Sequence, residues 1–185
     1  AEALKVESID FPSLTLSLRQ LCDLELIVNG GFSPLTGFMG AADCEGVLSD
    51  MRLSSGDLWP VPVTLDVDET FAQSLCVGDR VALRDTEGFM LAVLKIDELW
   101  RTDVEVESQQ LFGTTERAHP GVSALLTEAG RCRIGGAVEA TQPPNHYDFE
   151  SLRYTPLELR SQFAKLGWRQ VVAFHTSRPM HRMQR

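Results

Sequence analysis

The sequence predicts an α+β protein, in which a compact mixed β barrel with short helices precedes the opening helix and strand of an α/β domain. Short Val- and Leu-rich runs separated by turn formers fill the central residues, as is typical of a β-rich barrel. The final segment instead places a capped helix before an apolar run and a polar, basic cluster. With 185 residues, 43% of them hydrophobic, the chain can bury a core.

The first expected helix covers residues 16–28, where apolar side chains recur at helical intervals until Asn29-Gly30-Gly31 stops it. A loop rich in turn formers follows, and a second helix is expected over residues 41–51. Alternation and β-branched residues predict strands at residues 61–67, 80–84, 89–96 and 134–140. Asp85-Thr-Glu-Gly88 predicts a hairpin turn between two of these strands.

Thr141-Gln-Pro-Pro-Asn145 predicts a domain boundary, because paired prolines continue neither a helix nor a central strand. We therefore expect one domain over residues 1–145 and the start of a second, incomplete domain over residues 146–185. Thr155 and Pro156 are expected to begin a helix that Gly167 ends. The next four apolar residues, Val171–Phe174, then predict a buried parallel strand.

The residues after this apolar run indicate an anion site. His175, Arg178, His181 and Arg182 can donate to phosphate or sulfate oxygens, and backbone N–H groups converge at the carboxyl end of a parallel strand. The alternative is a solvated basic tail, and spacing alone does not separate the two interpretations.

Charge and composition narrow the classes of partner. The formal net charge of −9 disfavours nucleic acid as a main partner, whereas residues 169–185 contain arginines and no acid, which suits a small phosphorylated ligand. No apolar run is long enough for a bilayer and no apolar leader opens the chain, so we expect no membrane partner and a cytoplasmic location. The four cysteines form no Cys-x-x-Cys pair and are expected to be reduced.

Two acidic clusters are expected to be structural rather than metal-binding. The cluster from Asp66 to Glu69 lacks the spacing of an EF-hand, which favours capping of a helix start. Asp103, Glu105 and Glu107 have the pattern of a solvated face. We therefore predict no metal ligands in this chain.

The segment Val171–Arg185 resembles the nucleotide loop of ATP sulfurylases (sulfate adenylyltransferases), whose usual form is Val-Val-Ala-Phe-Gln-Thr-Arg-Asn-Pro-x-His-x-x-His. Other segments look like that family in the same order, namely residues 29–39, 58–67, 112–121, 146–149 and 155–160. The resemblance runs from about Leu14 to the last residue. It implies a PUA-like pseudo-barrel over residues 1–145 and the start of a nucleotidyltransferase catalytic domain over residues 146–185.

This resemblance also implies a reaction and its site. In the family, sulfate is joined to the α-phosphate of ATP and pyrophosphate is released, with Mg²⁺ expected beside the nucleotide. The position of His181 implies the catalytic histidine. The positions of His175, Thr176, Arg178 and Gln184 imply substrate and nucleotide binding.

Four polar positions of the loop depart from the family pattern. The family's glutamine is His175 here, its arginine is Ser177, its asparagine is Arg178 and its second histidine is Gln184. Each lost donor that is aimed at developing charge typically lowers the rate by about 10²–10³. We therefore expect a weak or inactive sulfurylase site.

A sulfurylase region with an inactive site would make most sense as a scaffold in a bifunctional protein that also carries an adenylylsulfate kinase. Two alternatives stay open at this point: a working sulfurylase in which a shifted loop brings Arg178 to the sulfate, and a PUA-like RNA-binding module. The expected ligands are ATP and either sulfate or adenylyl sulfate, and the expected assembly is a homo-oligomer.

Overall fold

The computed structural model describes residues 2–127, 129–177, 179, 181 and 182. Contacts divide the chain into two units, residues 1–147 and 148–185. The first unit contains helices α1 (Glu2–Glu7), α2 (Leu18–Val28), α3 (Ala41–Asp50), α4 (Glu69–Gln73), α5 (Val104–Phe112) and α6 (Pro120–Thr127), a 3-10 turn η1 (Ser8–Asp10), and strands β1 (Ser13–Thr15), β2 (Gly37–Phe38), β3 (Leu65–Val67), β4 (Arg80–Arg84), β5 (Met90–Lys95), β6 (Glu98–Arg101) and β7 (Cys132–Ala140). The second unit contains a 3-10 turn η2 (Glu150–Leu152) and helix α7 (Pro156–Lys165).

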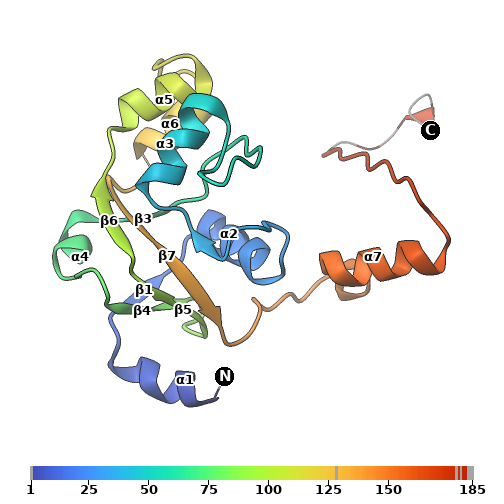
Figure 1. Ribbon diagram of the computed structural model, residues 1–185, viewed down its shortest axis with the longest axis horizontal. Helices are drawn as coiled ribbons and strands as arrows, with labels where there is room; N and C mark the ends of the chain where they lie inside the picture. Colours follow the sequence, from blue (N-terminus) through green and yellow to red (C-terminus); the bar gives the residue numbers. More distant parts are fainter. Residues whose placement is uncertain (1, 128, 178, 180, 183–185) are drawn as a thin grey trace. The chain divides into compact units, whose positions relative to one another are not determined.

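The strands form one sheet whose connections centre on β7. The hydrogen-bonded order is β1-β4-β5-β7-β2, and β3 and β6 also pair with β7. β1 and β4 are parallel, and the other pairs are antiparallel. In Figure 1, β7 crosses the middle of the first unit, with α3, α5 and α6 at one end and α1 at the other. This arrangement confirms the predicted α+β class and its mixed β barrel.

β7 pairs with four strands because its glycines let other backbone segments come close. A Cβ added at Gly136 would lie 2.0 Å from the carbonyl oxygen of Lys95, and one added at Gly37 would lie 2.0 Å from the carbonyl oxygen of Gly136. No side chain fits at such a distance. The crossing of β2, β5 and β7 therefore depends on glycine at these positions.

The two predicted helices of the first unit are present. α2 begins after Ser17, whose hydroxyl accepts from the backbone of Gln20 while the Gln20 side chain accepts from the backbone of Ser17. α2 buries Leu24 and Ile27 against the core. α3 ends at Met51, which adopts the left-handed conformation.

The predicted hairpin joins β4 and β5. Oδ1 of Asp85 accepts from the backbone N–H groups of Glu87 and Phe89, at 3.0 and 2.8 Å, and Gly88 has a positive φ of 91°. Both strands are nearly continuous in apolar residues because they lie inside the core. The fully buried residues of this core are Leu24, Leu65, Val81, Leu83, Leu91, Ala92, Leu94, Ile96 and Ile134.

The predicted strand over residues 61–67 is too long, because only Leu65–Val67 pair as β3. Pro60 and Pro62 lack the backbone N–H that a ladder requires. The segment nevertheless packs beside the sheet, with the Val63 carbonyl oxygen accepting from the Met39 N–H at 3.0 Å.

The second unit contains the predicted helix but not the predicted strand. α7 is present with its expected cap, whereas residues 171–176 have no regular secondary structure and Val172 is 96% exposed. A buried strand needs hydrogen-bonding neighbours on both sides, and the described residues of this unit supply none. The expectation of a buried strand at Val171–Phe174 is therefore wrong for the chain as it stands here.

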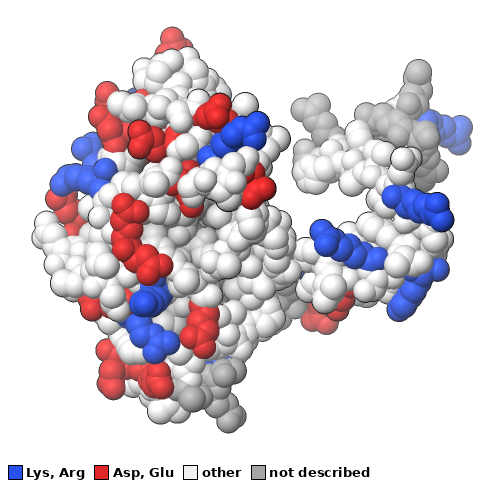
Figure 2. Space-filling view, in the orientation of Figure 1, with Lys and Arg blue, Asp and Glu red and all other residues white. Residues whose placement is uncertain are grey.

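Neither unit contains, among its described residues, a helix with the length and apolar content required to cross a bilayer. Figure 2 shows acidic and basic side chains interspersed over the visible face of the first unit. The second unit differs in composition, with three acidic and seven basic residues over residues 148–185. The basic character of residues 169–185 thus extends to the balance of the whole second unit.

Candidate functional site

The segment with the candidate loop begins at α7, whose start is fixed by a reciprocal cap. The Thr155 hydroxyl accepts from the Glu158 N–H at 3.3 Å, and Glu158 Oε2 accepts from the Thr155 N–H at 2.8 Å. The hydrogen bonds that the Thr155 backbone N–H and hydroxyl donate to the carboxylate lower the pKa of Glu158. Because Pro156 lacks an N–H that the first turn would leave unpaired, it suits the first helical position.

The helix ends where the sequence predicts. Gly167 has a positive φ of 71°, and Trp168 then folds back so that its ring stacks on Phe163 with centroids 5.9 Å apart. The chain continues through residues 169–177 without a helix or strand. The candidate loop therefore follows a capped helix but is itself irregular.

The structure describes three of the five predicted site residues. His175, Thr176 and His181 are all exposed, in the irregular segment that follows α7. Arg178 and Gln184, which the sequence assigns to substrate or nucleotide binding, lie outside the described residues. Within the described part of the chain, no three His, Cys, Asp or Glu side chains gather as a metal site would require.

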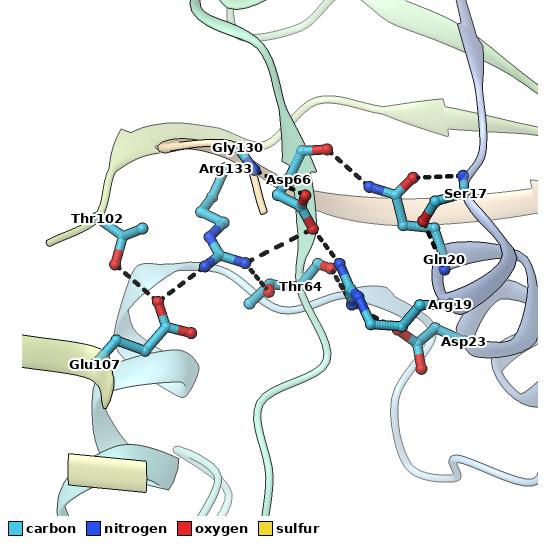
Figure 3. A network of polar contacts seen from close by, with 10 residues as sticks. All are labelled: Ser17, Arg19, Gln20, Asp23, Thr64, Asp66, Thr102, Glu107, Gly130 and Arg133. Carbon is cyan, nitrogen blue, oxygen red and sulfur yellow. Dashed lines mark hydrogen bonds and ion pairs between the residues drawn. The ribbon is translucent and has the colours of Figure 1, made fainter. Parts of the chain in front are cut away.

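A second polar centre lies in the first unit, and the sequence does not predict it. Figure 3 shows Arg133 of β7 between two carboxylates. Its Nη2 lies 2.8 Å from Glu107 Oε2, and its Nη1 lies 2.6 Å from Thr64 Oγ1 and 3.8 Å from Asp66 Oδ1. The side chain of Arg133 is 3% exposed and that of Glu107 is 5% exposed. This is a buried ion-pair network.

Asp66 connects this network to α2. Arg19 donates to Asp66 Oδ1, the Gly130 N–H donates to Oδ2 at 3.0 Å, and Gln20 donates to the backbone carbonyl of Asp66 at 2.8 Å. Asp23 completes the group through an ion pair of 3.0 Å with Arg19. Burial raises the pKa of the Asp23 carboxyl, and Arg19 offsets part of that rise.

Two sequence interpretations are therefore corrected. Asp68 caps α4, as expected of its cluster, but Asp66 is a buried partner of two arginines. Glu107 does not belong to a solvated face. It shares the inward face of α5 with Val104, three residues before it. A charged residue at helical spacing from an apolar one is the sequence signal that could have indicated its burial.

Comparison with known proteins gives these features a family. The description "PUA-like domain" matches residues 1–143, and the description "ATP-sulfurylase" matches residues 150–185. The chain belongs to the PUA-like domain family. Its PUA-like domain is followed by the start of an ATP-sulfurylase domain. The predicted ATP-sulfurylase resemblance and its PUA-like fold are thereby confirmed.

Individual relatives support the assignment over the full chain. It is 45% identical to the sulfate adenylyltransferase of Schizosaccharomyces pombe over 186 residues, which are 100% of this chain and 38% of that protein. It is 48% identical to the sulfate adenylyltransferase of Emericella nidulans over 187 residues, which are 100% of this chain and 32% of that protein. The chain thus spans about a third of the length of the curated relatives that it matches.

A solved structure shares both fold and sequence. The hexameric APS kinase from Thiobacillus denitrificans superimposes with a TM-score of 0.78 at 39% identity, covering 99% of this chain and 32% of that one. The fold of this chain therefore also occurs within a protein that is described as an APS kinase.

Proposed function

We propose that this chain is the N-terminal part of a sulfate-activating protein whose sulfurylase site is weak or inactive and whose sulfurylase region acts as a scaffold beside an adenylylsulfate kinase. The observation that carries the proposal is the change of four polar positions in the nucleotide loop, at His175, Ser177, Arg178 and Gln184. The proposed domains are residues 1–145 and the opening of a catalytic domain over residues 146–185.

The chemistry of the reaction explains why these changes matter. Transfer of the adenylyl group to sulfate needs donors that hold two anions together while charge builds on the phosphoryl oxygens, rather than a nucleophile on the protein. An arginine at position 177 would offer a bidentate, charged contact that Ser177 cannot make. Replacement of a protonated histidine by Gln184 removes one positive charge.

Some binding capacity is proposed to persist. His181 keeps its family position, and His175 and Thr176 are exposed where a phosphate could reach them. We propose ATP and adenylyl sulfate as the ligands of the parent protein. Mg²⁺ commonly binds through substrate phosphates with several waters retained, so the absence of a three-residue metal cluster among the described residues is compatible with ATP binding.

The kinase and the oligomer are proposed from the solved relative. A chain that matches 99% of this one lies within a protein described as a hexameric APS kinase. We infer that the parent is a cytoplasmic homo-oligomer with a kinase domain after the sulfurylase region. The irregular residues 171–177 would then gain the sheet neighbours that they lack here.

The test is an assay of the full-length parent for ATP formation from adenylyl sulfate and pyrophosphate. We expect no sulfurylase turnover, together with ATP-dependent phosphorylation of adenylyl sulfate. A loop restored to the family pattern (His175→Gln, Ser177→Arg, Arg178→Asn and Gln184→His) should raise sulfurylase turnover roughly 100-fold or more. The kinase activity of the restored protein serves as the folding control.

Measurable sulfurylase turnover by the unaltered parent would overturn the proposal. It would favour the working enzyme with a shifted loop, in which Arg178 contacts sulfate. An Arg178→Gln variant would then lose that turnover while keeping kinase activity.

A further inference from the structure

A pocket in the first unit has no role in the proposed sulfurylase chemistry. It has a volume of about 370 Å³ and lies between α2, residues 61–66, α5 and α6. Leu111, Phe112 and Leu125 contribute apolar walls, and the buried network of Figure 3 forms its polar side. Small-molecule sites commonly measure about 300–1,000 Å³ and combine apolar walls with a few polar groups. Both criteria are met here.

Glu107 supplies an acceptor to this pocket that the protein leaves open. Its Oε2 accepts from Arg133 at 2.8 Å and from Thr102 at 3.2 Å. Its Oε1 takes no hydrogen bond from the residues that the structure describes, and no dashed line reaches it in Figure 3. Since no described side-chain N or O atom is both fully buried and unpaired, Oε1 retains access to the pocket that Glu107 lines.

One carboxylate oxygen at the pocket lacks a hydrogen-bonding partner. Two carboxylates, of Asp66 and Glu107, and two guanidinium groups, of Arg19 and Arg133, line the pocket. Both oxygens of Asp66 already accept hydrogen bonds, from Arg19 and from the Gly130 N–H. The unmatched acceptor is therefore on Glu107, and a buried carboxylate oxygen gains most from a charged donor.

We propose that this pocket binds a small amphipathic amine. Its protonated amino group donates to Glu107 Oε1, and its apolar body packs against Leu111, Phe112 and Leu125. Neutral molecules of the same shape contact the apolar walls but bring no charged donor to the Glu107 carboxylate. Anions of the same shape are repelled by it.

The probe for the test is 2-phenylethylamine. Two analogues of similar shape serve as control ligands, 2-phenylethanol as the neutral match and 3-phenylpropionate as the anionic match. Binding to the full chain is followed by amide chemical shifts and by calorimetry at neutral pH. We expect shifts at residues of α5 and α6, and affinity for the amine roughly tenfold or more above that for either match, as a charge-assisted hydrogen bond implies. Absence of binding at millimolar amine, or equal affinity for the alcohol, would overturn the proposal.

Two variants locate the site. Ala124→Phe fills the pocket from α6 without touching the charged groups and should weaken amine binding roughly tenfold. Ala42→Phe makes the same change at an exposed position of α3 and should leave binding unchanged. Unaltered amine binding by Ala124→Phe would contradict the assignment.

Glu107→Gln tests the role of the charge separately, because it preserves the size of the side chain. This variant should lose the preference for the amine over the alcohol while still binding the apolar ring. Retention of the full preference would place the recognition elsewhere. Thermal unfolding of each variant reports whether it is folded when binding is measured.

Discussion

At the scale of single residues, Arg133 and its two carboxylates form a buried network of charges in the first unit. An arginine that is 3% exposed is stable only if its charge is matched, and Glu107, Asp66 and Thr64 provide that match. Together with Arg19, the network joins α2, β3, α5 and β7 (Figure 3). It therefore fixes elements that are distant in sequence.

Removal of this arginine should be costly. Arg133→Met leaves Glu107 buried without its partner, and we expect the free energy of unfolding to fall by about 3–5 kcal/mol. Arg52→Met, which breaks an exposed ion pair of 3.7 Å with Asp50, should change it by less than about 1 kcal/mol. Urea denaturation measures both. Equal effects of the two variants would show that the network contributes little.

Cys44 offers a pH-dependent test of packing near the same network. Burial, followed by the nearby Glu107 carboxylate, raises the pKa of the Cys44 thiol to about 11. The thiolate is the reactive form, so the Cys44 thiol stays protonated at pH 8 and gains reactivity as the pH approaches 11.

We expect iodoacetamide at pH 8 to modify the exposed Cys22 and Cys76 first and Cys44 roughly 100-fold more slowly. Peptide mass spectrometry follows the rates at each site. In concentrated denaturant the three rates should become similar. Rapid labelling of Cys44 in the folded protein would contradict its burial.

At the scale of elements, local caps and backbone contacts decide where helices begin and where strands end. α2 and α7 both start with a hydroxyl residue followed three positions later by a residue that returns the hydrogen bond. These signals are local, so the sequence locates both helices. β3 instead begins only after Pro60 and Pro62, and the extent of its pairing is set by β7.

The cap of α2 should contribute measurably to stability. Ser17→Ala removes the acceptor for the Gln20 N–H and should lower the free energy of unfolding by about 1 kcal/mol. Ser49→Ala, at an exposed hydroxyl on α3, should change it by less than about 0.5 kcal/mol. Chemical denaturation compares the two. A smaller loss for Ser17→Ala than for Ser49→Ala would exclude the capping role.

At the scale of the whole molecule, the two units differ in how far they can stand alone. Residues 1–147 contain the sheet and its buried core, whereas in the second unit α7 exposes Leu157 and the following segment exposes Val172 and Phe174. An apolar surface of that kind needs a partner to bury it.

We expect a chain of residues 1–147 to unfold cooperatively on its own, with a thermal midpoint close to that of residues 1–185. A peptide of residues 148–185 should show little cooperative unfolding, because a helix of ten residues is marginal in isolation. Circular dichroism during heating measures both. Loss of folded structure in residues 1–147 would show that the second unit is required.

The sequence by itself determined the α+β class, α2, α3 and α7, the hairpin of β4 and β5, and the family of the chain, because caps, turns and motifs are local in sequence. Only the tertiary structure placed Asp66 and Glu107 beside Arg133, since those contacts span 67 and 26 positions along the chain. It likewise left Val171–Phe174 unpaired. A strand depends on neighbours that an apolar run cannot supply by itself.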